Sequence, residues 1–216
     1  MVVVQFLLFV SLLLYSPNVA HSKLGYRNRN SFSKLFGGGV VRGDNIPELL
    51  TLIDSSNRGV LKFANEEIKC LIDTIASKNS QFIDNDKNLV EKIDGNWELL
   101  WTTEKETLFF VQNGLFGNPV NGVFQSIDVK NRVINNLIRF RNGGEFSVQG
   151  SIDINLSEKK RVNFEFQGAY LKIPPVPKIP IPPVGKGWFD NLYVNNLYRL
   201  SKDIRGDYLV SKRVLT

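Results

Sequence analysis

The side chains that most often carry enzyme chemistry are scarce in this chain of 216 residues, which has one histidine, His21, and one cysteine, Cys70. We expect His21 to be removed with an N-terminal leader. That removal leaves no base for a Ser/His/Asp or Cys/His mechanism and no histidine for a metal site. A single cysteine cannot form an intrachain disulfide, which fits a reducing compartment. Cys70 is expected to be a small packed residue.

Carboxylates are the groups that remain for acid–base chemistry. The candidates are Asp128, Asp153, Glu165 and Asp190. Asp153 and Glu165 occupy the polar positions of alternating segments, so we expect them on a solvated sheet face. Asp190, beside a proline-rich stretch, is the acid whose position most favours a catalytic hypothesis.

Aromatic residues predict a binding site instead. Trp97, Leu99 and Trp101 are expected to share one face of a strand, because strand side chains alternate with a period of two. Arg199 is the one basic residue among the apolar neighbours of a late segment. Gly95-x-Trp97 on a first strand, with an arginine on a late strand, resembles the lipocalins, in which the arginine covers the tryptophan. The resemblance implies that the guanidinium group of Arg199 stacks on Trp97, a contact worth about 0.5–2 kcal/mol. The alternative is a surface arginine that faces solvent.

A hollow barrel would be lined by these and other large side chains. The predicted ligand-binding residues are Trp97, Trp101, Phe124, Phe146, Phe164, Phe166, Tyr193 and Arg199. Such a cavity binds by burial, at about 25 cal/mol per Å² of apolar surface. A barrel of about eight strands can also be filled by its own side chains, so a solid interior is the alternative. No metal or cofactor is expected.

Helical spacing of apolar residues precedes Trp97. It predicts a short helix over residues 46–53 that ends at Asn57-Arg58-Gly59. A second helix is predicted to start at Asn65, and residues 89–93 give one more helical turn. These helices are expected to plug or flank the barrel.

The chain after Trp97 alternates apolar and polar residues, which predicts a mainly β fold: an antiparallel barrel with short N-terminal α-helices. Gly150 and Gly168 are expected at inward positions, where they permit bending or leave room for a ligand. The expected strands cover residues 97–103, 107–111, 120–129, 132–141, 146–154, 162–170, 192–200 and 208–214.

Residues 173–187 hold six of the nine prolines and no acidic residue. Proline lacks an N–H donor, so this stretch cannot be a central strand and should be an extended, stiff loop. Its apolar and basic composition suits a lid or a contact with a lipid surface. A passive crossover between strands is the alternative.

The net charge of +6 is concentrated at the N-terminus, because residues 1–43 hold five basic residues and no acidic one. Subtracting five from +6 leaves about +1 for residues 44–216. A nearly neutral domain lacks the electrostatic footprint of nucleic-acid binding.

The leader has two parts. Residues 2–15 form an apolar run shorter than the roughly 20 residues of a membrane span. Ala20-His21-Ser22 has the small-x-small pattern that suits signal peptidase. Residues 1–22 are therefore predicted to be a signal peptide. A retained anchor is the alternative. Residues 23–43 are predicted to be a transit-peptide-like segment, or else a basic linker on a secreted protein. Residues 44–216 form the predicted domain.

Three segments in order resemble the plastid lipid-associated proteins, or fibrillins. The G-x-W-x-L-x-Y-T-T/S opening of that family resembles Gly95-Asn96-Trp97-Glu98-Leu99-Leu100-Trp101-Thr102-Thr103. Its Q-x-I-D plus R-V-x-N hairpin is similar to residues 125–129 and 132–135. Its W-L-D-x-x-Y-L-D-x-x-L-R-I stretch resembles residues 187–199, with Asn195 where the family has a carboxylate. The resemblance covers about residues 45–214.

The resemblance implies a lipocalin-like barrel in a plastid, at thylakoids or plastoglobules. The order of the leader, a signal peptide and then a transit-like segment, is the order needed to reach a complex plastid inside the endomembrane system. It implies a non-catalytic protein that binds carotenoids, prenylquinones, fatty acids or other lipids and contacts a membrane or plastoglobule surface. One alternative is an accessory factor that handles an apolar intermediate for a biosynthetic enzyme of prenylquinone synthesis. The others are a secreted lipocalin-like carrier and a carboxylate enzyme.

Overall fold

The computed structural model describes residues 45–85, 88–154, 160–182 and 185–215. The predicted signal peptide and the transit-peptide-like segment therefore lie outside the described residues. Within the described part, no helix combines the length and the apolarity needed to cross a membrane.

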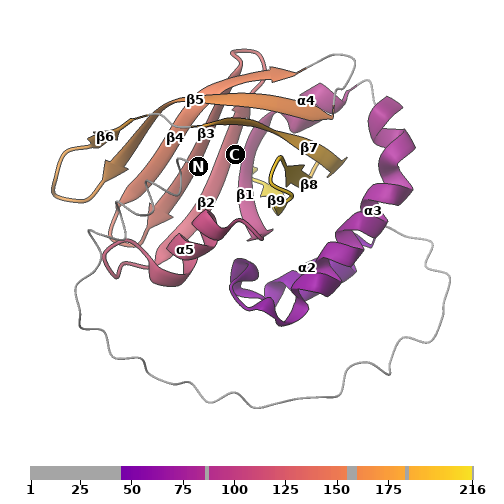
Figure 1. Ribbon diagram of the computed structural model, residues 1–216, viewed down its shortest axis with the longest axis horizontal. Helices are drawn as coiled ribbons and strands as arrows, with labels where there is room; N and C mark the ends of the chain where they lie inside the picture. The colour runs from indigo at the N-terminus through magenta and orange to yellow at the C-terminus, as the bar shows by residue number, and fades with distance from the viewer. Residues whose placement is uncertain (1–44, 86–87, 155–159, 183–184, 216) are drawn as a thin grey trace.

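Among the described residues, eight antiparallel strands close into a barrel (Figure 1). Neighbours around it run β1-β2-β3-β4-β5-β7-β8-β9, and β9 pairs with β1 to complete the circle. The short β6 pairs with the C-terminal part of β5, beyond the residues of β5 that pair with β7. The strands are β1 (Gly95–Thr102), β2 (Val120–Asp128), β3 (Val133–Phe140), β4 (Glu145–Ile154), β5 (Arg161–Lys172), β6 (Ile179–Ile181), β7 (Lys186–Val194), β8 (Tyr198–Asp203) and β9 (Tyr208–Arg213). The predicted antiparallel barrel is confirmed.

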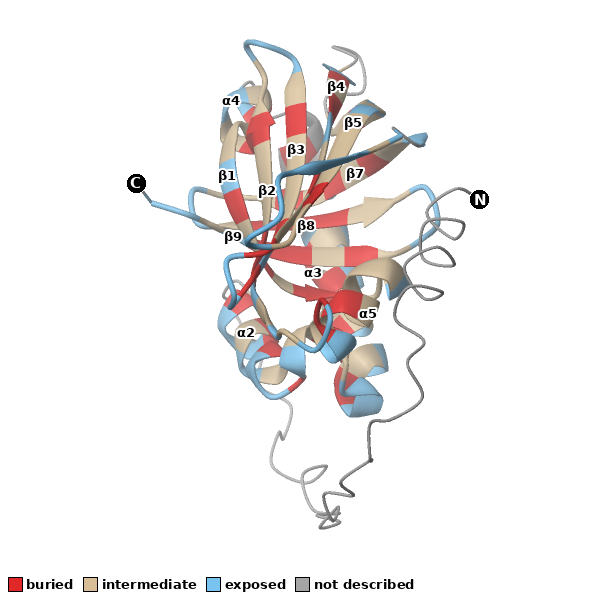
Figure 2. Ribbon diagram, turned by 90° about the vertical axis from the view of Figure 1, so that its left-hand side faces the viewer, coloured by how far each residue is buried: buried red, intermediate tan, exposed pale blue. Residues whose placement is uncertain are grey.

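The predicted N-terminal helices are confirmed. They are α2 (Ile46–Asp54), the 3-10 turns η1 (Asn57–Gly59) and η2 (Lys62–Ala64), α3 (Asn65–Asn85) and α4 (Leu89–Ile93). The apolar stripes of α2 and α3 pack outside the barrel, on β1, β7, β8 and β9, where they bury Trp101, Leu200 and Val210 (Figure 2). Helix α4 instead closes one end of the barrel, where Leu89 and Ile93 pack with Trp97. Cys70 is exposed on α3, so the expectation that it is packed is wrong.

A β-bulge in β1 changes the face on which its second tryptophan lies. Leu99 pairs with Ser211 and Trp101 pairs with Val210, so Leu100 is an extra residue in the ladder. An extra residue shifts the alternation by one position. Trp97 remains inside the barrel, whereas Trp101 packs outside against α2 and α3. The prediction that both tryptophans share one face is wrong for this reason.

Two further bulges act in the same way. In β7 the extra residue is Leu192, and Tyr193 therefore packs outside the barrel with the helices. In β5 the extra residue is Gln167, so Gly168 pairs with the exposed Gln149 and faces outward rather than inward.

The predicted strand at residues 107–111 is wrong, because this segment belongs to helix α5 (Lys105–Asn113). The helix covers one end of the barrel, where Phe110 stacks on Phe146 with ring centroids 5.5 Å apart. Burial of Phe110 among the strand side chains outweighs the β-propensity of the segment. Gly114, at φ 69°, ends the helix with a backbone conformation that suits glycine.

The predicted strand at residues 192–200 is also divided, into the end of β7 and the start of β8. Asn195 causes the break, because its side-chain oxygen accepts hydrogen bonds from the backbone N–H groups of Leu197 and Tyr198. Such a local side-chain turn replaces the sheet ladder. The described part of the proline-rich stretch is mainly exposed, as predicted for a loop, but it contains the unpredicted strand β6, and β7 already begins at Lys186.

Candidate functional site

The barrel encloses a cavity of about 420 Å³, a size typical of small-molecule sites. Aromatic rings face it from several strands and from α5. The aromatic residues that line it include Trp97, Phe110, Phe146, Phe164, Phe166 and Phe189. The barrel is therefore partly hollow rather than filled by its own side chains.

Trp97 forms the floor of this cavity. The indole is fully buried, and its Nε1 donates a hydrogen bond of 2.9 Å to the backbone oxygen of Ile93 on α4. Beyond the indole, an apolar cluster that includes Leu89, Ile127 and Ile134 fills this end of the barrel. The floor is thus a ring held in one orientation by a hydrogen bond and by packing on α4.

Arg199 lies on this floor, as the sequence predicted. Its guanidinium carbon is 5.1 Å from the centroid of the Trp97 ring and 5.4 Å from that of Phe189, within the range of cation–π contacts. The residue is 1% exposed. Burial, with a further contribution from the charge of Arg213, lowers the pKa of Arg199 to about 9, which leaves it cationic at neutral pH.

The hydrogen bonds of Arg199 are incomplete. Its Nη2 donates to the Oε1 atom of Gln125, which in turn bonds Asn136 through its amide nitrogen at 2.9 Å. Nε and Nη1 of Arg199 are buried and have no partner in the described part of the chain. A buried charged donor without a partner is costly, and here it borders the cavity.

Arg213 differs from Arg199 although it also lies over Trp97, with its guanidinium carbon 4.3 Å from the ring centroid. Its Nε and Nη1 donate to the backbone oxygens of Asn196 and Asp94 at 2.9 and 2.7 Å, and its Nη2 donates to that of Lys92. Backbone carbonyls therefore satisfy the donors of Arg213. Its role is to join the C-terminal strand to the segment before β1.

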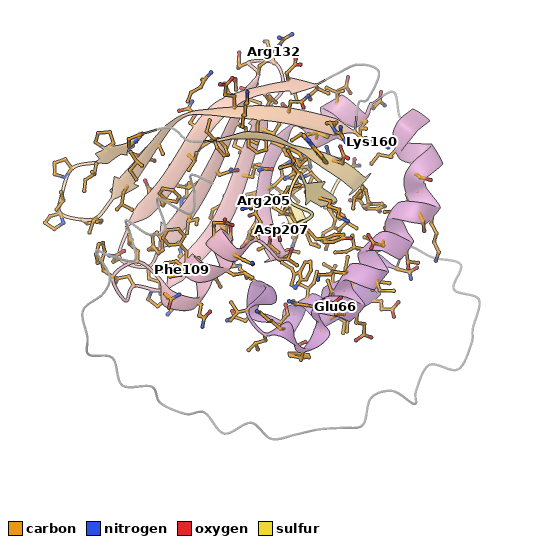
Figure 3. The ribbon with its side chains drawn as sticks, viewed as in Figure 1. Glu66, Phe109, Arg132, Lys160, Arg205 and Asp207 are labelled. Atoms are coloured by element: carbon orange, nitrogen blue, oxygen red, sulfur yellow. The ribbon has the colours of Figure 1, made fainter. Side chains whose placement is uncertain are left out.

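The opposite end of the cavity carries a cluster of charges between α5 and the turn that joins β8 to β9. Figure 3 shows Arg205 and Asp207 in this turn. Arg205 pairs with Glu106 at 2.7 Å and with Asp203 at 3.2 Å, and it lies 3.6 Å from both Glu104 and Asp207. Partial burial lowers the pKa of Arg205. The hydrogen bond and charge of Glu106, together with the other acids, raise it by more, so the pKa lies above its ordinary value.

Glu104 has an altered protonation equilibrium at this end. Burial raises its pKa to about 7. The hydrogen bond from Thr107 and the charge of Arg205 oppose that rise, whereas Asp203 and Asp207 add to it. Glu104 thus exchanges a proton near neutral pH while it holds the end of the barrel at α5.

The structure brings together most of the predicted ligand-binding residues and leaves two outside. Trp101 and Tyr193 pack against the helices, because the bulges at Leu100 and Leu192 turn them outward. Phe124 contributes to the cavity wall, but its ring lies 5.2 Å from the guanidinium carbon of Arg139, which is exposed. The predicted residues that border the cavity are Trp97, Phe124, Phe146, Phe164, Phe166 and Arg199.

Several cavity residues were missed by the sequence reasoning. Phe110 was assigned to a strand, and Gln125 was seen only as part of a hairpin. Ser201 and Ser211 also border the cavity beside Arg199. Their alternation with Leu200 and Val210 on the last two strands was a signal that could have placed them inside.

The carboxylates proposed for catalysis do not form a site. Asp153 and Glu165 are exposed, as predicted. Asp128 bonds Asn131 in its own turn, and Asp190 forms a two-point pair with Arg161 at 2.8 and 2.9 Å. No group of three His, Cys, Asp or Glu side chains able to hold a metal occurs in the described residues.

Comparison with known proteins agrees with this architecture. The PAP_fibrillin family model matches residues 44–212. The chain belongs to the PAP/fibrillin family. It is 41% identical over 171 residues to the probable plastid-lipid-associated protein 11, chloroplastic, of Arabidopsis thaliana, a match that covers 77% of each chain. It is 30% identical over 136 residues to the probable plastid-lipid-associated protein 12, chloroplastic, of the same plant, across 56% of this chain and 32% of that protein. No solved structure matches the chain significantly.

Proposed function

We propose that this fibrillin is a non-catalytic plastid protein that holds a hydrophobic molecule inside its barrel. The ligand classes that fit are carotenoids, prenylquinones, fatty acids and other lipids. Its relatives are named plastid-lipid-associated and chloroplastic, which supports a plastid location and an association with lipid. Thylakoids or plastoglobules are the proposed sites of action.

The cavity of about 420 Å³ is the observation that carries the proposal. Aromatic rings such as Phe146 and Phe164 supply apolar surface but no reactive group. Each additional area of about 100 Å² of apolar ligand surface buried there contributes about 2.5 kcal/mol. The carboxylates near the cavity, Glu104 and Glu106, are held by hydrogen bonds or ion pairs to Thr107 and Arg205. This arrangement favours binding over catalysis.

The proline-rich loop supports a contact with a lipid surface. Val176 and Ile179 are 49% and 43% exposed in it, and no acidic residue lies between Lys172 and Lys186. Exposed apolar side chains flanked by lysines suit an anionic membrane interface. In flotation with anionic liposomes, the double variant Val176→Asp and Ile179→Asp is expected to lose most of the bound fraction. Retention of the wild-type fraction would refute this part of the proposal.

The ligand is tested by isolating the protein from its native membrane fraction and identifying copurifying molecules by mass spectrometry. We expect one hydrophobic compound in nearly stoichiometric amount. Val148→Phe adds volume to the cavity wall and should reduce the recovered ligand severalfold, whereas Val214→Phe, on an exposed residue, should not. Recovery of bulk lipids at low ratio from the wild type contradicts the proposal. Copurification of a prenylquinone-synthesising enzyme would indicate the accessory role instead.

A further inference from the structure

The inside of the barrel is polar on one side, although its other walls are apolar. The polar side chains lie around Arg199, on β2, β8 and β9, and comprise Gln125, Ser201 and Ser211. Each of these three carries no charge. Arg199 therefore borders the cavity among neutral polar side chains at the floor.

Arg199 forms no ion pair with the described residues. Its Nη2 atom has Gln125 as a partner, whereas Nε and Nη1 have none among the described residues. A neighbouring charge that lowers the pKa of Arg199 belongs to another cation, Arg213. A buried cation without a carboxylate partner is unfavourable, unless an anion that is absent from the protein chain completes the site.

Arg213 cannot take that anion in place of Arg199. Its three guanidinium nitrogens already donate to backbone oxygens, among them those of Asp94 and Asn196. The two cations together make the floor electropositive, and Arg199 alone has free donors to offer.

The opposite end of the cavity has the reverse charge. Glu104, Glu106, Asp203 and Asp207 surround Arg205 there, and Lys186 also borders the cavity, so the acids outnumber the cations. An anionic group is repelled at that end and attracted at the floor. The charge distribution therefore fixes one orientation for a ligand with an anionic head and an apolar tail.

We infer that Arg199 binds the carboxylate of a single-chain lipid acid, whose hydrocarbon tail runs along the aromatic walls toward the acidic end of the barrel. The inference rests on the proposed function and specifies its ligand class. A carboxylate can accept two hydrogen bonds and so matches the one floor arginine, Arg199, two of whose donor nitrogens lack partners in the described chain. A diphosphate carries more charge than this site neutralises. The tail contacts Phe146, Phe164 and Phe166.

The test compares the affinities of the full-length protein for hexadecanoate and for hexadecanol, which share a tail and differ in the head group. Wild type is expected to bind the acid at least about tenfold more tightly, since a charge-assisted hydrogen bond is worth that much. Arg199→Met should remove this preference while the alcohol affinity stays within about threefold. Arg139→Met, on the exposed face, should change neither affinity.

Each result separates the inference from the function on which it rests. Equal wild-type affinities for acid and alcohol, or a preference that persists in Arg199→Met, overturn the carboxylate site alone. Failure of both lipids to bind overturns the cavity function as well. If the protein binds geranylgeranyl diphosphate more tightly than hexadecanoate, the proposal that the ligand head group carries a single negative charge is wrong. If Arg199→Met does not fold, the inference is tested by the ratio of the wild-type affinities for hexadecanoate and hexadecanol. It is also tested by Arg199→Lys, which keeps the charge and should keep a preference for the acid.

Discussion

Arg199 on β8 lies with its guanidinium carbon 5.1 Å from the centroid of the Trp97 ring on β1. The two residues are 102 positions apart, and β9 lies between their strands in the sheet. Trp97 is fully buried and Arg199 is 1% exposed. The contact therefore joins the first and the penultimate strand through the inside of the barrel and defines where the cavity ends.

The two buried tryptophans of β1 should respond differently to the same substitution. Trp97→Phe loses the hydrogen bond to Ile93 and weakens two cation–π contacts. The Nε1 atom of Trp101 has no hydrogen-bond partner in the described chain, so Trp101→Phe loses only volume. We expect Trp97→Phe to lower the free energy of unfolding by about 1–3 kcal/mol more than Trp101→Phe. Urea denaturation of both variants measures the difference, and equal losses would contradict it.

Two glycines in neighbouring strands give a second matched pair. A Cβ atom on Gly150 would lie 2.3 Å from the backbone oxygen of Glu165, whereas one on Gly168 would have no atom within 4 Å. Gly150→Ala must displace β5 and is expected to cost about 2 kcal/mol or more. Gly168→Ala is expected to stay within about 0.5 kcal/mol of wild type. Thermal unfolding of the two variants distinguishes these outcomes, and a stable Gly150→Ala protein would show that the bulge can move.

The stability of the barrel should fall as the pH rises through neutrality, because of Glu104. Its pKa is about 7 in the folded protein and 4.5 when exposed, so the folded state holds a proton that the unfolded chain releases. This contribution is complete below pH 4.5 and is lost as the pH rises through 7. We expect a loss of about 2–3 kcal/mol between roughly pH 5 and 8.

Glu104→Gln should remove this pH dependence, because an amide has no proton to release. Glu91→Gln, which changes an exposed acid on α4, should retain it. Urea midpoints at several pH values give the comparison. The same slope in Glu104→Gln as in wild type would assign the effect to another group.

The helices and most strands could be predicted from local patterns. Leu49 and Ile53 recur at helical spacing, and they do face the barrel from α2. Residues such as Phe146 and Val148 alternate with polar neighbours, and both border the cavity. These predictions succeed because periodicity is a local property that the burial of one face enforces.

Trp101, Tyr193 and Gly168 were misplaced for one common reason. Each follows an extra residue in a strand, at Leu100, Gln167 or Leu192. A bulge cannot be recognised from the alternation in the sequence, but it reverses which side of the sheet the following side chains occupy. At β1, Arg58 donates from Nε to the backbone oxygen of Leu99 beside the bulge, a bond formed by a residue 41 positions away.

The sequence by itself determined a mainly β domain with helices before it, because alternation and helical spacing are visible along the chain. Tertiary structure decided that Arg199 stacks on Trp97 rather than facing solvent, that the barrel is hollow and that α5 covers one end. It also left two donor nitrogens of Arg199 without a partner among the described residues. The cavity volume and the hydrogen-bond partners of Arg199 depend on which side chains meet across the barrel. The bulges decide which side chains face inward, and they depend on contacts between residues distant in sequence.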